Sequence, residues 1–153
     1  MATTLTAATL TVAVSENLTL DGRVYDKTTT TTIASVKNVS SRIYSVPATT
    51  TLGVASLLSA PTSSEFDTEN TKYIRITNLD DTNSVIITKA TSGTSAAEEV
   101  RAGGSIYMID GAKDVKGATS KAAQTALAEI QTIYAYSATA TVTLDIEVVI
   151  ATA

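Results

Sequence analysis

Hydrophobic and polar residues alternate with a period of two near the C-terminus of the chain. The apolar positions of this segment are Val142, Leu144, Ile146, Val148 and Ile150. Since successive side chains of a strand point to opposite faces, this spacing predicts a strand with one buried face. Residues 130–136 have the composition of a partner strand, and the short link 137–140 predicts a hairpin between the two.

Two further hairpins are predicted in the middle of the chain. Residues 72–77 and 84–88 flank a segment rich in Asn and Asp, whose side chains bond local backbone groups and favour turns. Residues 99–101 and 106–109 flank Gly103-Gly104 in the same way.

Short strands are also predicted throughout the N-terminal half of the chain. The predicted strands are 9–14, 17–20, 23–25, 28–36, 39–46 and 52–58. Asp21-Gly22 predicts a tight two-residue turn, Lys37-Asn38 predicts another turn, and Pro61 follows the last of these strands.

We therefore expect an all-β protein, an antiparallel β-sandwich or jelly roll of eight to ten short strands. Its length of 153 residues fits a single domain, residues 1–153. Residues 111–119 read as a loop. The alanine-rich segment 120–129 is compatible with one short helix, although it has no strong cap.

Composition argues against catalysis. The chain has 29 threonines, which favour strands, and it contains no histidine, cysteine or tryptophan. A serine or threonine nucleophile needs a base, and histidine is the usual one. We expect no enzyme activity, no catalytic or cofactor-binding residues, no cofactor and no metal site.

The remaining polar clusters have simpler explanations than chemistry. Asp80-Asp81 and Glu98-Glu99 are sequence neighbours, which point to opposite faces of a strand and do not form a facing acid pair. Asp80, Asp81 and Asn83 lack the spacing of a calcium loop and predict an Asx turn, as does the segment 67–70. The threonine run 28–32 predicts a solvated strand rather than an ice-binding lattice, because no repeat stacks it.

Charge narrows the choice of partners. The net charge is −4 and the basic residues are scattered, so we expect no nucleic-acid binding. No segment has the length of a membrane helix, and the N-terminus does not read as a secretory signal. Residues 43–64 and 130–144 carry no charge, and such strands favour burial against another subunit.

The segment 73–80 (YIRITNLD), followed by Ser84-Val85-Ile86-Ile87, resembles a hairpin of small tailed-phage virion proteins. The turn in 100–108 and the alternating C-terminal segment from residue 130 are also similar to theirs. The resemblance covers residues 71–151.

The resemblance implies a non-enzymatic virion protein, most simply a capsid decoration (cement) protein made in the bacterial host cytoplasm. Its expected partner is the major capsid protein or another virion protein. We expect a homo-oligomer, with a trimer favoured over a dimer, and an inter-subunit or shell contact by residues 3–14.

Two alternatives remain. One is a tail or neck component. The other is a host-receptor or carbohydrate-binding sandwich, which would need an exposed aromatic pair such as Tyr44 with Tyr107, or Tyr134 with Tyr136.

Overall fold

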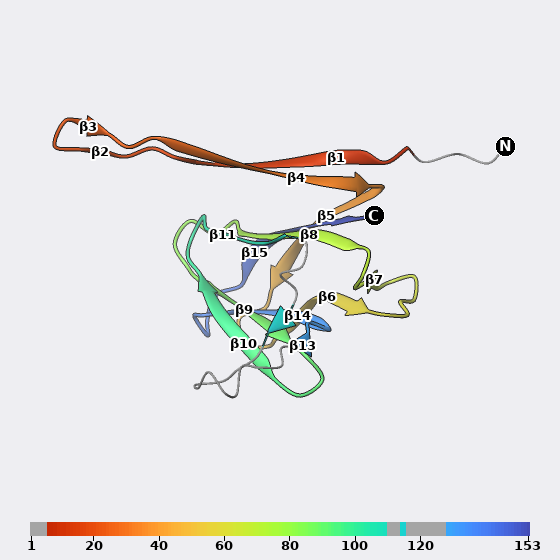
Figure 1. Cartoon of the computed structure of the whole chain (residues 1–153). Coiled ribbons are helices and arrows are strands. Elements are labelled where there is room, and N and C mark those ends of the chain that lie inside the picture. The colour runs from red at the N-terminus through yellow and green to blue at the C-terminus, as the bar shows by residue number, and fades with distance from the viewer. Residues whose placement is uncertain (1–5, 110–113, 116–127) are drawn as a thin grey trace, which may run out of the picture.

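The computed structural model describes residues 6–109, 114–115 and 128–153, and within them it is all-β. Two packed sheets form a sandwich, and a long N-terminal hairpin projects from it (Figure 1). Ten strands have five or more residues, in agreement with the expected eight to ten. No helix in the described part of the chain is long and apolar enough to cross a membrane.

The four-stranded sheet has the order β11-β8-β15-β5. Its strands are β5 (Asn38–Val46), β8 (Thr71–Asn78), β11 (Ser105–Ile109) and β15 (Leu144–Thr152). The five-stranded sheet has the order β10-β9-β14-β6-β7. Its strands are β6 (Leu52–Leu58), β7 (Phe66–Asp67), β9 (Val85–Ala90), β10 (Ser95–Val100) and β14 (Thr132–Ser137).

The pairing follows the order of a jelly roll. The first and last sandwich strands pair (β5 with β15), then the second with the second-last (β6 with β14), then β8 with β11 and β9 with β10. All four pairs are antiparallel, as if one long hairpin were rolled into two sheets. Between the two alternatives predicted from the sequence, the topology is that of a jelly roll.

The core lies between the two sheets, where the alternating apolar residues of both meet. Its fully buried members include Ile76 and Ile146 from one sheet, and Ile87 and Ile133 from the other. Alternation therefore predicted correctly which face of the C-terminal strand is buried: Leu144, Ile146, Val148 and Ile150 are all inside.

The three hairpins predicted for the middle and C-terminal parts are wrong as pairings. Strands β8 and β9, β10 and β11, and β14 and β15 follow each other in sequence but belong to different sheets. The segments between them cross the gap of about 10 Å between packed sheets. Each strand still buries its apolar face, because an arch satisfies the alternation as well as a hairpin does.

The turn predicted at Lys37-Asn38 does not join a hairpin either. Strand β4 (Lys27–Val36) pairs with β1 (Ala8–Glu16), whereas β5 pairs with β15, and only Lys37 separates β4 from β5. Ser35 has a positive φ of 63°, and the Lys37 N–H donates to the Thr152 carbonyl. The chain thus changes direction here and enters the sandwich.

The helix considered for 120–129 falls mostly outside the described residues. Its last two residues, Ala128–Glu129, form strand β13 and pair with β12 (Asp114–Val115), so these four residues are extended. The loop expected at 111–119 is likewise only partly described, and it contains β12.

Candidate functional site

The N-terminal hairpin is the main candidate for an interaction surface, and we call residues 8–36 the arm. It consists of two ladders in one register, β1 with β4 from Leu10 opposite Ile33 to Glu16 opposite Lys27, and then the short strands β2 (Thr19–Leu20) and β3 (Arg23–Val24). The turn at its tip is Asp21-Gly22, with φ of 49° and 75°. Two positive φ values define the tight turn predicted from the sequence.

The base of the arm packs on the outer face of the four-stranded sheet. Ile33 and Val36 of the arm are buried against Tyr73 of β8 and Ala151 of β15. The partly buried members of this second cluster are Leu10, Val12, Ile109 and Val149. Burial at the base raises the pKa of the Tyr73 hydroxyl, and the opposing influence of Arg75 is smaller.

The distal arm leaves the sandwich, and every residue from 13 to 30 is exposed (Figure 1). Strand alternation and the ladder register place four large apolar side chains on the face that is buried at the base. These are Val14 (49% exposed), Leu18 (54%), Leu20 (56%) and Tyr25 (51%). The face that is buried at the base therefore continues for about 23 Å beyond the surface that covers it, with these four apolar side chains beside the charged residues Glu16, Lys27 and Arg23.

The opposite face of the distal arm is dominated by hydroxyl groups. It carries Thr28 and Thr30 of the threonine run, with Ser15 and Thr19 on the other strand. The Ser15 and Thr28 hydroxyls lie 3.0 Å apart, within hydrogen-bond distance. Thr28 to Thr30 are solvated strand residues, as predicted. The separation of the two faces is incomplete, because Glu16 opposite Lys27 and Arg23 share the face of Val14 and Leu20, and Val24 lies on the hydroxyl-rich face.

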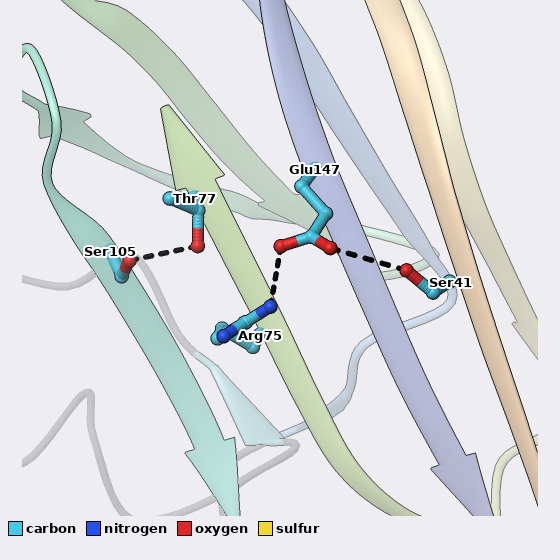
Figure 2. Close-up of polar contacts among 5 residues, drawn as sticks. All are labelled: Ser41, Arg75, Thr77, Ser105 and Glu147. Atoms are coloured by element: carbon cyan, nitrogen blue, oxygen red, sulfur yellow. Dashed lines mark hydrogen bonds and ion pairs between the residues drawn. The ribbon is translucent and has the colours of Figure 1, made fainter. Parts of the chain in front are cut away.

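A polar ladder crosses the outer face of the four-stranded sheet beside the arm's base (Figure 2). The Glu147 carboxylate of β15 forms an ion pair with Arg75 of β8 and accepts a hydrogen bond of 3.2 Å from the Ser41 hydroxyl of β5. Thr77 and Ser105 bond across β8 and β11 at 2.8 Å. The apolar area on which the arm lies therefore ends at a row of paired polar side chains, in which the buried Arg75 Nε has no hydrogen-bond partner among the described residues.

The acidic clusters form turns. The Asp80 carboxylate accepts hydrogen bonds from the backbone N–H groups of Thr82 (2.8 Å) and Asn83 (2.6 Å), which lower its pKa. Asp67 accepts from the backbone N–H of Glu69 at 2.8 Å. Both are the Asx turns expected from the sequence. Glu98 pairs with Lys89 on the adjacent strand, and Glu98 and Glu99 point to opposite faces of β10.

The two tyrosine pairs considered for carbohydrate binding differ in whether their members share a face of one sheet. Tyr44 and Tyr107 lie on opposite edge strands, β5 and β11, and face opposite sides of the sheet, so they form no pair. Tyr134 and Tyr136 share the outer face of the other sheet, and Tyr136 borders a groove of about 370 Å³ lined with Thr49, Thr50 and Thr51.

A larger groove of about 610 Å³ opens between β5 of one sheet and β6 and β7 of the other. Its lining includes Arg42 and Tyr44 of β5, Glu65 just before β7, and Asp67 of β7. Both acids are engaged locally, since Glu65 accepts a 2.8 Å bond from the Thr62 N–H. Among the described residues, no group of three or more acidic side chains is placed to hold a metal ion.

The contact predicted for residues 3–14 includes residues 3–5, which lie outside the described residues, and it did not include the tip of the arm. The signal was present, because Leu18, Leu20 and Tyr25 continue the apolar alternation of Leu10 and Val12 around the Asp21-Gly22 turn. Comparisons with protein-family models, curated proteins and solved structures gave no match, so the function has to be argued from this geometry.

Proposed function

We propose that this protein is a non-enzymatic structural subunit that binds a neighbouring subunit through the distal arm. The observation that carries the proposal is the row of exposed apolar side chains Val14, Leu18, Leu20 and Tyr25, which continues the face buried at the base and alternates there with charged residues. A two-stranded hairpin is marginally stable by itself in water. A surface that covers this face would both order the arm and join two subunits.

The free energy expected from burial of the arm's exposed apolar side chains suits an assembly held by many weak contacts. Full burial of one such side chain stabilises by about 1.5–3 kcal/mol, before the cost of ordering the arm. The net gain for one arm is therefore small. In a symmetric shell the same contact recurs at every subunit, and a linked oligomer multiplies it through avidity.

We propose that the assembly is a virion and that the protein is a capsid decoration protein. Support comes from the resemblance of residues 71–151 to tailed-phage virion proteins, together with a jelly-roll topology, which viral capsid domains share with lectins. The fold alone does not decide function. The proposed partner is the major capsid protein or another virion protein. It would be bound by a dimer or trimer of this chain. In a variant of this proposal, the protein is a tail or neck component of the virion.

Rebinding to capsids stripped of small virion proteins tests the proposal. The double substitution Leu18→Asp and Leu20→Asp should weaken binding at least about a hundredfold, because each aspartate removes an apolar contact worth about 1.4 kcal/mol or more. Val24→Asp is the control, since Val24 is also exposed at the tip (64%) but lies on the opposite face. Equal loss in both variants, or no capsid binding by the unmodified protein, would contradict the proposal.

A second candidate is a carbohydrate-binding module, favoured by Tyr136 beside the threonine-lined groove. Sugar rings stack on aromatic faces while hydroxyl groups bond their edges. If this candidate is right, the protein binds cell-surface glycans on an array and Tyr136→Ala abolishes that binding, whereas the arm variants retain it.

A further inference from the structure

Strand β5 is an open edge of the four-stranded sheet. Within the described part of the chain it pairs only with β15, although it is nine residues long. It contains no proline, glycine or bulge, and its single charged residue is Arg42. Its outward face carries Val39 (56% exposed) and Ile43 (68% exposed). A long edge strand with exposed apolar side chains is a template for pairing with another strand.

Two edges of the other sheet are protected against such pairing. Strand β10 carries two adjacent charges, Glu98 and Glu99, in six residues. Strand β7 has only two residues. Charged residues and short strands are the usual means of blocking an edge. Strand β5 is nine residues long and carries one charge, Arg42, so its edge is less protected than those of β7 and β10, which favours a partner strand at this edge.

We propose that β5 pairs antiparallel with β5 of a second copy of this chain, about a twofold axis that passes through Ser41. The odd-numbered residues of β5 point to the outer face of the sheet. The two outer faces therefore lie on the same side only if odd-numbered residues of one copy pair with odd-numbered residues of the other. In the proposed register Val39 lies opposite Ile43 of the other copy, twice by symmetry. Ser40 lies opposite Arg42 on the inner face, and Ser41 lies opposite its own copy.

The sequence of β5 selects a second copy as the partner. An isologous contact requires a self-complementary surface. Around Ser41 the strand reads apolar, polar, serine, polar, apolar in both directions, from Val39 to Ile43. Moving the axis to Arg42 would place two guanidinium groups directly opposite each other, which is destabilising, and would pair Ile43 with Ser41.

Among the described residues, the features that flank β5 lie on its faces rather than at its free edge. Val39 is not part of the cluster under the arm, and the groove beside β5 lies on its inner side. Pairing of residues 38–44 would span about 23 Å and join the two four-stranded sheets into one of eight strands. This size is within the range of natural open sheets.

Cross-linking tests the register directly, because the chain has no cysteine. Ser41→Cys places the two thiols across a strand pair, where the Cα separation of about 4.5–5.5 Å suits a disulfide. Ser45→Cys is the matched control on the same strand and face, and its two copies would lie about 27 Å apart. On mild oxidation we expect Ser41→Cys to form a linked dimer at least about tenfold faster than Ser45→Cys.

The mass of the unmodified protein in solution supplies a second measurement. Sedimentation over about a hundredfold range of concentration should show a dimer of the 15.8 kDa chain. Ile43→Lys should shift it to the monomer, whereas Tyr107→Lys, at the opposite edge of the same sheet, should not. A monomer at all concentrations, or equal cross-linking of the two cysteine variants, would overturn the pairing.

The arm does not enter this contact, so the two proposals can fail separately. A dimer that survives Ile43→Lys but is lost with Leu18→Asp and Leu20→Asp would assign self-association to the arm and overturn the β5 pairing. Loss of capsid binding in the arm variants with an intact Ser41 cross-link would support both proposals.

Discussion

At the scale of single residues, the Asn78 side chain forms hydrogen bonds with the backbone of segments that cross between the two sheets at one end of the sandwich. It is fully buried, and its Nδ2 donates to the carbonyls of Asn83 (2.8 Å) and Val100 (3.1 Å). Its Oδ1 accepts from the Asp80 N–H at 3.1 Å. One side chain therefore satisfies backbone groups of the β8–β9 segment and the end of β10. Sequence reasoning assigned this residue only to a turn.

Asn78→Ala should lower the free energy of unfolding by about 2–4 kcal/mol, because it leaves buried backbone groups without partners. Denaturant unfolding measures this change. Asn17→Ala, at an exposed position of the arm, is the control and should change stability by less than about 0.5 kcal/mol. A loss as small as the control's would show that water replaces the Asn78 bonds.

At the scale of elements, the arm combines a fixed base with an unsupported tip. The base belongs to a buried cluster, while residues 13–30 are all exposed, although the two parts share one register. The two-residue turn and the alternation of the arm could be predicted from local sequence. Where the sandwich stops covering the arm could not, since it depends on how far β8 and β15 extend beneath it.

Replacement of residues 13–30 by Asn-Gly should leave the sandwich intact. The turn would join Val12 to Thr31, which already pair in the ladder, and Asn-Gly favours the required turn type. We expect the midpoint of thermal unfolding to change by no more than about 3 °C, because no buried residue is removed. Capsid binding should be lost in the same variant. A large loss of stability would mean that the tip folds back on the sandwich.

At the scale of the whole molecule, stability should vary little between about pH 5.5 and 8, because the chain contains no histidine. Two groups set the limits. The lowered pKa of Asp80 gives stability that is present above its unfolded pKa of about 3.9 and is lost as pH falls through the folded value. The raised pKa of Tyr73 gives stability that is present below about 10 and is lost as pH rises through the folded value.

Unfolding curves measured across pH check this behaviour. Tyr73→Phe keeps the ring in the cluster under the arm and removes the ionisation, so it should reduce the loss of stability above pH 10. Tyr25→Phe is the matched control, because Tyr25 is exposed on the distal arm. A midpoint that changes strongly between pH 6 and 8 would contradict the prediction.

Local sequence was sufficient for the all-β class, for the buried face of each clear strand and for the turns at Asp21-Gly22 and Asp80. These features depend on side chains within a few residues of each other. Only the tertiary structure decided which strands pair, why β14 and β15 enter different sheets, and that β5 ends as an open edge. The physical reason is that hairpins and arches bury the same alternating faces. The choice between them depends on contacts between strands far apart in the chain.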